Sequence, residues 1–464
     1  MLPDDPLDRL RRYPLLDALR ERRSRRFGLG MTLPAGPLGY QSRHPGLPLA
    51  EGEEALLAFA ACGITGPALA DLAYAPGQGG TIMAGLVGRT IASGDAIQSV
   101  AVFVINAEAA YLLKRPRDFA LREIAELVAL AAADEYQALY RRSRIPVLAG
   151  RPAAPLAPPY NLDVNRWSLY DPAGTYFLPV NDLTLLYLNG VLEIFGETTG
   201  AFVVDERAGF RAAGLARFAR SRGGHLADDP REGRVLTIRD LESLVTEFAT
   251  IEQGMVIQNL GLMAQAMGLG GFPHWAAHPY GWLHALGFRM DTLPASRYLG
   301  LSRPLAWASR LLGRDVPVPL ALGLEQGGQV LLAPYRPPYY RSMEAAVRAV
   351  VELKFGAAGV FRGGATAGPW RDPSAVAQAA APPSPAAIDA TIAYATYVWE
   401  RYGRFPAYAP PFRTVLGFQA SHLDVEFYDR FYRREALAAT QREHLARWHG
   451  GAPPEASARP GPAR

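Results

Sequence analysis

Four arginines surround one serine near the start of the chain, in the segment ERRSRRF at residues 21–27. A guanidinium group stays charged at physiological pH, and its planar fork of donors can bind a phosphate through two hydrogen bonds. The segment therefore predicts an anion site to which Arg22, Arg23, Ser24 and Arg26 contribute. The alternative is a charged helix end that faces solvent.

A short polar segment at residues 89–98, RTIASGDAIQ, leads directly into an apolar run. Its small residues would let backbone N–H groups and the hydroxyl of Ser93 approach the edge of a ligand. The run that follows, SVAVFVIN at residues 99–106, is rich in β-branched residues and predicts a buried strand. These segments together indicate a ligand-contacting loop that feeds into a strand.

Two later segments add a glycine-rich helix end and another arginine. Residues 258–275, QNLGLMAQAMGLGGFPHW, predict a buried helix that stops at glycines and is followed by a sharp turn at Pro273. The apolar run VPVPLALGL at residues 316–324 predicts another buried strand, and Arg336 and Arg341 come after it, ahead of a helix. Guanidinium groups from distant parts of the chain would then converge on one phosphate.

In this order, the four segments resemble the flavin-dependent nitroreductase family. That family opens with an R-R-S-x-R-x-F-like segment, continues with P-S-x-x-N-x-Q before a strand, and has an A-x-x-x-G-L-G helix end followed by P-I-E-G. The positions that match here are Arg22, Arg23, Ser24, Arg26, Ser93, Gln98, Gly270 and Pro273, and Ala92 stands at the position of the family's first Pro. Ala96 replaces the family's Asn, and His274, Trp275 and Ala276 stand where I-E-G would follow the proline. Arg336 is the best match to a basic residue that follows a late strand in the family.

The resemblance covers about residues 18–360 and implies a bound flavin mononucleotide (FMN). Hydride would pass between a reduced donor, the flavin and an acceptor, while the protein holds their planes in contact. The N-terminal arginines and Ser24 would bind the phosphate, and Arg336 would close it from the far side. The flavin ring would lie near residues 272–275, with Trp275 or His274 available for stacking or hydrogen bonding.

Within this family, His274 is the candidate proton donor by position, since the protein seldom supplies another acid. The segment LLAFAACGITG at residues 56–66 is similar to the branch that dehydrogenates azoline rings in peptides. The resemblance therefore implies a small-molecule or peptide acceptor, with NADH, NADPH or another reductant as the donor. A flavin-binding or storage protein without catalytic activity is the alternative.

The resemblance also implies an α+β fold, with a mixed sheet wrapped by helices and a homodimer with FMN at its interface. The flavin-binding domain would span residues 1–362, with an insertion at about 150–235 that begins at a proline-rich connector. Residues 363–386 are rich in Gly, Ala and Pro and predict a linker. A helical C-terminal extension at 387–450 and a disordered tail at 451–464 would follow.

Apolar periodicity and capping residues predict the helices that hold these segments in place. Asp118 is the expected N-cap of one long helix, and a capping-box spacing from Thr237 to Asp240 opens another. The segment GAFVVDERAGFR at 200–211 predicts a strand pair. The predicted helices span residues 5–26, 51–63, 118–142, 237–268, 341–356, 386–402 and 424–447.

The composition narrows the class of protein. The chain has 464 residues, 49% of them hydrophobic, so it can bury a sizeable core. Its net charge is +4 with acidic and basic residues interspersed, which does not indicate nucleic-acid binding. The single cysteine, Cys62, excludes an internal disulfide framework, and no apolar run approaches the length of a membrane span. We therefore expect a cytoplasmic protein with neither nucleic-acid nor membrane partners.

Several common catalytic signatures are missing from the sequence, including a P-loop, G-x-G-x-x-G, G-x-S-x-G and H-E-x-x-H. The segment HWAAHPYGWLH contains His274, His278 and His284 and would serve a metal-dependent hydrolase. The prolines at 273 and 279 disfavour a regular helix there, so no metal site is expected.

The predicted C-terminal extension contains a further pair of polar residues. His422 and Asp424 could assist proton transfer from a lid over the flavin. The alternative, which we favour, is that Asp424 caps a helix whose aromatic face packs on the main domain.

Overall fold

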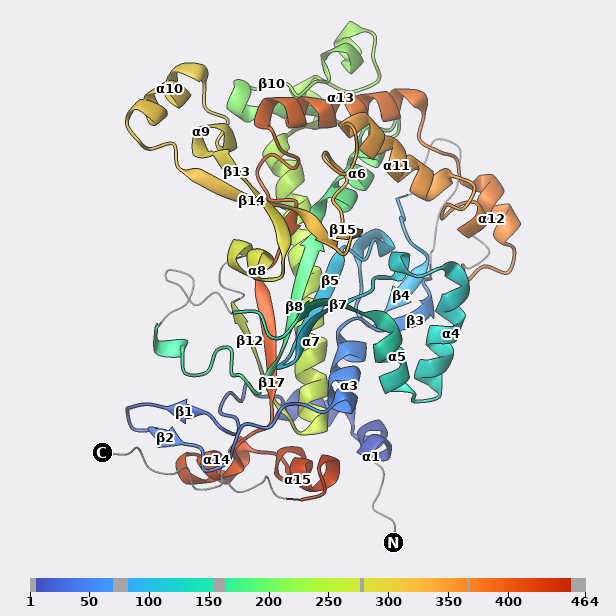
Figure 1. The fold of residues 1–464 in the computed structure, drawn as a ribbon. Helices are drawn as coiled ribbons and strands as arrows, with labels where there is room; N and C mark the ends of the chain where they lie inside the picture. The colour runs from blue at the N-terminus through green and yellow to red at the C-terminus, as the bar shows by residue number, and fades with distance from the viewer. Residues whose placement is uncertain (1–5, 70–81, 154–162, 276–278, 365–367, 452–464) are drawn as a thin grey trace.

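The computed structural model describes residues 6–69, 82–153, 163–275, 279–364 and 368–451 as an α+β protein (Figure 1). Its main sheet has the strand order β12-β17-β8-β5-β6-β7, and a short strand, β16, also pairs with β8. The strands are β5 (Val100–Ile105), β6 (Ala109–Leu113), β7 (Arg144–Ala149), β8 (Thr175–Asp182), β12 (Gly270–Trp275), β16 (Phe412–Arg413) and β17 (Leu416–Ser421). The predicted strand at 99–106 is confirmed as β5.

Every pairing within this main sheet is antiparallel, whereas the sequence predicted a mixed sheet. A parallel pair occurs in a small sheet formed by β9 (Phe202–Asp205), β10 (Arg211–Ala212) and β11 (Val235–Thr237). The predicted strand pair at 200–211 is confirmed by β9 and β10. Other small sheets pair β1 (Thr32–Leu33) with β2 (Tyr40–Gln41), β3 (Ile64–Pro67) with β4 (Val87–Arg89), and β14 (Pro317–Gln326) with both β13 (Phe288–Pro294) and β15 (Gln329–Leu332).

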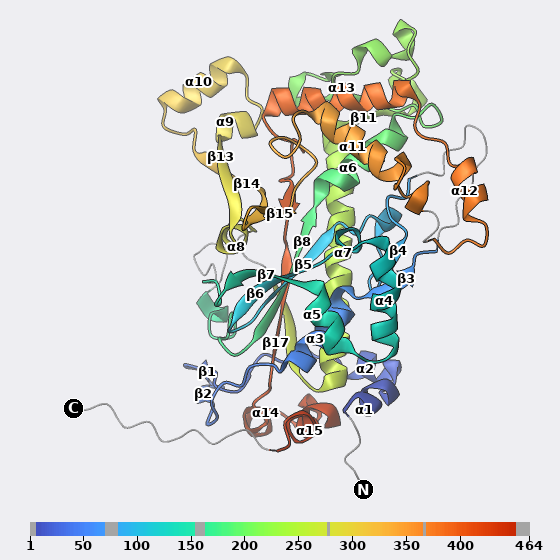
Figure 2. The same ribbon diagram turned by 45° about the vertical axis from the view of Figure 1, so that its right-hand side comes forward.

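The helix α7 (Ile238–Met267) is 30 residues long and runs the length of the molecule beside the main sheet (Figure 2). Thr237 and Asp240 form the predicted capping box, and Gly268 ends the helix at φ +88°, where a residue without a side chain is favoured. α7 and α3 (Glu51–Cys62) pack apolar residues against β5, β8 and β17 to form one core cluster. The predicted helices at 51–63 and 237–268 are thus confirmed.

A second layer of helices covers the upper end of the molecule in Figure 1. It consists of α6 (Leu183–Ile194), α11 (Met343–Phe355), α13 (Pro385–Tyr402) and the first half of α7, which share a large apolar cluster. The predicted helices at 341–356 and 386–402 are confirmed. The remaining helices are α1 (Pro6–Arg12), α2 (Leu15–Glu21), α4 (Leu121–Ala132), α5 (Tyr136–Ser143), α8 (Pro279–Ala285), α9 (Ala295–Tyr298), α10 (Arg303–Leu311), α12 (Pro373–Ala379), α14 (Val425–Phe431) and α15 (Ala439–Trp448).

Three predicted helices are interrupted in the structure, and the one expected at 424–447 is divided into α14 and α15. The expected helix at 118–142 is two helices, α4 and α5, because Asp134 adopts φ +59° between them. Asp118 bonds to the side chain of Arg115 instead of capping α4. The expected helix at 5–26 is two helices, α1 and α2, which are separated at Pro14; α2 ends at Glu21, so the arginine segment that follows is not helical.

The C-terminal segment differs most from the prediction of a purely helical extension. Its strand β17 lies in the main sheet between β12 and β8, and the helices α14 and α15 follow it at the lower end (Figure 1). Five of the six residues of β17 are buried, so both of its faces are covered and no alternation marks it as a strand. The predicted linker at 363–386 contains α12. Among the described helices, none combines the length and the apolar composition that crossing a bilayer demands.

Candidate functional site

The N-terminal arginine segment lies along the free edge of β12. Arg25 pairs with Gly271 through an antiparallel backbone bridge, and Gly28 pairs with Leu423 in the same way. The structure therefore brings two of the predicted site segments together, although most of the predicted flavin-binding domain lies between them in the sequence. Gly270 and Pro273 lie on the same strand.

Within this segment, the buried guanidinium belongs to Arg25, which the resemblance did not select. Arg25 is 4% exposed and donates to Oε1 of Gln265 and to the carbonyl of Ala436, both at 2.8 Å. Burial lowers the pKa of Arg25. Its hydrogen-bond acceptors are the Gln265 amide and backbone carbonyls, which are neutral, so Arg25 ties the segment to α7 and to the C-terminal region.

The predicted phosphate ligands are more exposed. Arg23 and Ser24 face solvent, and Arg23 donates to the backbone carbonyls of Arg20 and Arg22. Arg22 is half-buried beside Gly261 of α7. Arg26 is half-buried and donates to Asn165 at 3.3 Å.

Of the four predicted residues, Arg26 is the one placed against side chains of the β12 region. Its guanidinium carbon lies 5.4 Å from the ring centre of Trp167 and 5.8 Å from that of Phe272. Cation–π contacts of this kind stabilise the arginine without a carboxylate partner. Arg26 therefore contacts β12, but the contact is to a ring.

Ser93 and Gln98 lie in a different place, at the start of β5. The hydroxyl of Ser93 bonds to the carboxylate of Glu252 on α7 and accepts the backbone N–H of Gln98 at 2.9 Å. Glu252 also accepts from Val100 and Asn181, each at 3.1 Å. A phosphate at Ser93 would meet this carboxylate, so the network attaches β5 to α7 and does not form an anion site.

Gln98 lines a cavity of about 220 Å³ together with the side chain of Arg117. Within the described part of the chain, Oε1 of Gln98 and all three guanidinium nitrogens of Arg117 lack a hydrogen-bond partner. Burial, and then the neighbouring charge of Arg115, lower the pKa of Arg117.

Arg336 lies at the opposite end of the main sheet from the arginine segment. Its guanidinium is buried and donates to the carbonyls of Pro337 and Ala321, at 3.1 and 3.3 Å. Burial lowers its pKa to about 10, and the charge of Asp182 partly opposes this.

The register of the main sheet gives the distance between the arginine segment and the end of β8 near Arg336. Gly271 pairs with Ala420, Ala420 pairs with Thr175, and Asp182 lies seven residues further along β8. At about 3.3 Å per residue, this is roughly 23 Å along the strand. A single phosphate cannot reach both the arginine segment and Arg336, so the structure does not bring these residues together.

His274, the candidate proton donor, is the fifth residue of β12. Its ring lies edge-on to Tyr170, with 5.4 Å between ring centres, and is tilted against Phe272 at 5.7 Å. The residue is half-buried, but its Nε2 is enclosed and has no hydrogen-bond partner among the described residues. Burial lowers the pKa of His274 to about 4. Its Nδ1 lies 3.2 Å from the carbonyl of Trp275, which favours the proton on Nδ1 and a lone pair on Nε2.

Trp275 is the last residue of β12 and is 62% exposed. It lines a cavity of about 580 Å³ that opens between the start of α7, the α9 region and the segment before β17. The other side chains that line this cavity include Arg239, Glu242, Glu247, Tyr298, Tyr408 and Arg413. A cavity of this volume can hold a drug-sized or nucleotide-sized ligand.

Two aromatic walls of this cavity are held by buried or half-buried arginines. The guanidinium carbon of Arg404 lies 3.3 Å from the ring centre of Tyr298, and that of Arg207 lies 3.6 Å from the ring centre of Tyr408. Glu242 accepts the backbone N–H groups of residues 407–409. Burial raises the pKa of Glu242 to about 8 despite these bonds. The Tyr298 and Tyr408 rings and the backbone of residues 407–409 are therefore held in place in the cavity wall.

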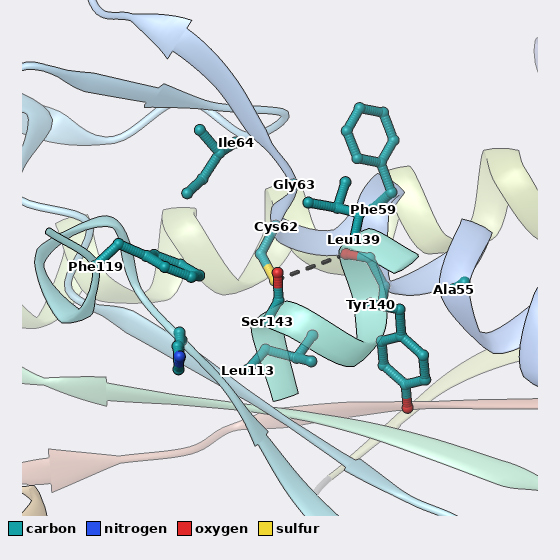
Figure 3. A pocket seen from close by; sticks show the side chains of 12 residues that line it. Ala55, Phe59, Cys62, Gly63, Ile64, Leu113, Phe119, Leu139, Tyr140 and Ser143 are labelled. Atoms are coloured by element: carbon teal, nitrogen blue, oxygen red, sulfur yellow. Dashed lines mark hydrogen bonds between the residues drawn. The ribbon is translucent and has the colours of Figure 1, made fainter. Parts of the chain in front are cut away.

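The pocket beside Cys62 is too small for a cofactor (Figure 3). Its volume is about 30 Å³, and its walls are mostly apolar side chains from α3, α5 and β6. That volume admits roughly one water molecule. The Cys62 thiol is free and buried.

Of the three histidines considered as metal ligands, the two that the structure describes lie on different elements, His274 on β12 and His284 on α8. His284 is exposed on α8, and His278 lies outside the described residues. Across the described residues, the potential metal-binding group that the structure contains is a different one, formed by Glu53, His422, His444 and His449.

The sequence analysis missed this group, although it noted His422. Asp424, its companion there, accepts the backbone N–H of Phe427 at 3.0 Å and caps α14, as the favoured alternative predicted. The sequence signal for this group is the H-x4-H spacing of His444 and His449 at the end of the last helix.

Comparisons with known proteins leave the family of this chain open. No protein-family model matches the sequence, and no curated protein matches it. Among solved structures, the chain is similar to a proposed nitroreductase from Ralstonia eutropha JMP134, with 13% sequence identity over 59% of this chain and 75% of the other, and a TM-score of 0.26. A likeness this weak supports neither a fold nor an activity, so the function must be argued from the cavities and side chains above.

Proposed function

We propose that the protein is an FMN-dependent oxidoreductase whose flavin binds in the cavity around Trp275. The observation that carries this proposal is the combination of size and lining in that cavity. Its volume of about 580 Å³ lies within the range of small-molecule sites. Trp275, Tyr298 and Tyr408 offer aromatic faces for a flat ring system, and two arginines offer cations for a phosphate.

The ten residues selected from the resemblance do not fit FMN as a single set, because they are distributed over three parts of the molecule. The cavity fits it better. Arg239 and Arg413 would bind the phosphate, and Trp275 would pack against the ring. Glu247 also lines the cavity and would disfavour a phosphate beside it, whereas the raised pKa of Glu242, about 8, keeps that carboxyl largely neutral at pH 7.

When bound, FMN supplies the hydride chemistry, and the protein's part is to bind, orient and exclude water. His274 precedes Trp275 on the same strand and stays neutral at physiological pH because burial lowers its pKa to about 4. A neutral ring with its lone pair on Nε2 accepts a proton more readily than it donates one. We therefore propose that His274 positions the β12 end and does not serve as the acid.

The state of His274 also favours the second candidate, a flavin-binding protein without turnover. Both candidates predict a yellow protein whose flavin is released on denaturation. The first predicts bleaching by NADH, NADPH or another reductant and reoxidation by a nitroaromatic, a quinone or an azoline-containing peptide. The second predicts no turnover with any of these acceptors.

Substitutions separate the two possible flavin locations. Trp275→Ala and Arg413→Ala should each lower flavin content at least tenfold, measured by absorbance of the purified protein. Arg22→Ala with Arg26→Ala, and separately Arg336→Met, serve as matched controls and should retain flavin. Loss of flavin in the Arg22/Arg26 variant alone would overturn the cavity as the site. A colourless protein that binds no added FMN would overturn the function.

We further propose that the protein is a homodimer, as the family resemblance implies. The helix α10 and the residues after it project from the body at the upper left of Figure 1. Leu305, Trp307, Leu311 and Leu312 there are 58, 67, 71 and 65% exposed. An apolar helix face of this kind is typical of an interface.

Light scattering of the native protein should give the mass of a dimer. The double variant Trp307→Glu with Leu311→Glu should give the mass of a monomer. A monomeric native protein would contradict the proposal.

A further inference from the structure

Three imidazole rings converge on one carboxylate oxygen at the lower end of the molecule. Nε2 of His422, His444 and His449 lie 3.1, 2.9 and 3.2 Å from Oε1 of Glu53. Nε2 of His422 also lies 3.0 Å from Nε2 of His449. All four atoms lie within 4.8 Å of one another. The four atoms therefore face a common point.

The other ring nitrogens determine which nitrogen carries the proton. Nδ1 of His422 lies 2.8 Å from the carbonyl of Leu47, and Nδ1 of His444 lies 2.8 Å from the carbonyl of Met267. A carbonyl only accepts hydrogen bonds, so each Nδ1 carries a proton and donates it. In a neutral ring, Nε2 then carries a lone pair. This backbone bond at the second nitrogen is the arrangement that orients metal-binding histidines in proteins.

Without a cation, this arrangement would be unfavourable. Two lone pairs would point at a buried carboxylate oxygen, and the Glu53 side chain is 0% exposed. Nε2 of His444 is buried and, among the described residues, has no partner aligned for a hydrogen bond. An ionised carboxylate that faces these lone pairs requires a positive charge at the point that it shares with the rings.

We propose that Glu53, His422, His444 and His449 bind one divalent transition-metal ion, for which Zn²⁺ is the best match. Three imidazoles and one carboxylate form a borderline N₃O set that suits Zn²⁺. With bonds of about 2.0–2.1 Å, the ligand atoms of a regular tetrahedron lie about 3.3 Å apart. The three N–O separations and the His422–His449 N–N separation, at 2.9–3.2 Å, need only a few tenths of an ångström of expansion, and the other two N–N separations lie within 4.8 Å.

The site is closed, so its role is structural. Four protein ligands complete a tetrahedron, whereas catalytic zinc keeps a position for water or substrate. Glu53 lies on α3, His422 follows β17, and His444 and His449 lie on and directly after α15. The metal would fasten the C-terminal helix to the main sheet and to α3. This inference is independent of the proposed flavin site, which lies at the Trp275 end of β12, whereas Ser421, next to His422, pairs with its Gly270 end.

The test measures metal in the full-length protein, purified without a polyhistidine tag. Plasma mass spectrometry should find about one Zn²⁺, or another divalent transition metal, for each chain. His449→Ala should lower the metal content at least tenfold and still fold, because the His449 side chain is 21% exposed at the end of α15. Glu53→Gln should also lose the metal, while its amide oxygen can still accept the N–H of Ala50 that caps α3.

His44→Ala is the matched control. Nε2 of His44 lies 3.2 Å from a carboxylate oxygen of Glu426, and its side chain is 17% exposed, so it reproduces the His449 contact outside the cluster. This variant should keep the metal. After removal of the native ion, added Co²⁺ should give the visible absorption of tetrahedral coordination in the native chain and not in His449→Ala. A native protein that holds no stoichiometric metal and binds no added Zn²⁺ would overturn the proposal, as would full metal content in His449→Ala.

Discussion

The histidine cluster and the arginine segment are neighbours, because Gly28, just after the arginines, pairs with Leu423, next to His422. Their side chains are nevertheless organised in opposite ways. Around Glu53, ligands from three distant segments face one point, and the second ring nitrogens of His422 and His444 are held by backbone carbonyls. Around Arg26, charged groups point to solvent, to a neighbouring carbonyl or to an aromatic ring. A motif in consecutive residues therefore does not make a site, whereas a convergent set with fixed orientations does.

The largest expected effect is the loss of stability when the proposed metal is removed. A strong chelator should lower the free energy of unfolding of the native protein by about 4 kcal/mol, the value for an ion present at about a thousand times its Kd. Thermal unfolding with and without chelator measures this. His449→Ala should be insensitive to the chelator, and an unchanged native transition would contradict a structural metal.

The next effect distinguishes the two neighbouring arginines of the N-terminal segment. Arg25→Met should destabilise by about 2–3 kcal/mol, because it leaves the buried Gln265 oxygen and the Ala436 carbonyl without their donor. Arg26→Met should cost less than about 1 kcal/mol, since its contacts are partly exposed. Urea unfolding of both variants is the measurement. Equal losses of unfolding free energy in the two variants would show that the whole arginine segment, and not Arg25 alone, is anchored to the rest of the protein.

A smaller effect should follow the titration of His274. Its folded pKa of about 4 lies below the ordinary value of 6.5, so the folded state favours the neutral ring. The associated stability is complete above about pH 6.5 and is lost as the pH falls towards 4, on the order of 2 kcal/mol for a partly exposed residue. His274→Phe should remove this part of the pH dependence, seen as a difference between the two unfolding curves. Parallel curves would show that His274 titrates normally.

The smallest effect concerns Arg117. Its guanidinium is buried, but no acceptor among the described residues bonds to it, unlike the side chains that face one another around Glu53. Replacing it by Met removes the cost of burying a charge and should stabilise the protein by about 1 kcal/mol. Arg115→Met is the control, because it removes the donors to Asp118 and should destabilise instead. Chemical unfolding of the two variants checks the sign. A destabilised Arg117→Met would mean that this guanidinium has a favourable partner in the folded protein.

Elements with caps and clear periodicity could be predicted from the sequence. Thr237, Asp240 and Gly268 define both ends of α7, and β5 is an uninterrupted apolar run. The strand β17 could not be predicted, because a six-residue strand with five buried residues carries neither a helical nor an alternating pattern. Its position in the middle of the sheet follows from pairing with β8 and β12, which depends on residues far away in the chain.

The site residues were harder to predict for a related reason. In an extended segment, successive side chains point to opposite sides, so Arg25 turns inward to Gln265 while Ser24 and Arg26 turn away. The spacing of arginines alone does not say which of them is buried. Glu53 and His449 lie close in space but 396 residues apart, and no local motif connects them. The H-x4-H pair supplies half of the cluster, and the fold supplies the rest.

One measurement tests the central claim that the protein has two separate cofactor sites. Native mass spectrometry of the intact chain should show one FMN and one divalent metal bound to each polypeptide. Trp275→Ala should lose only the flavin mass, and His449→Ala should lose only the metal mass. A native chain whose mass equals that of the bare polypeptide would contradict the account, and joint loss of both ligands from either variant would contradict the separation of the sites.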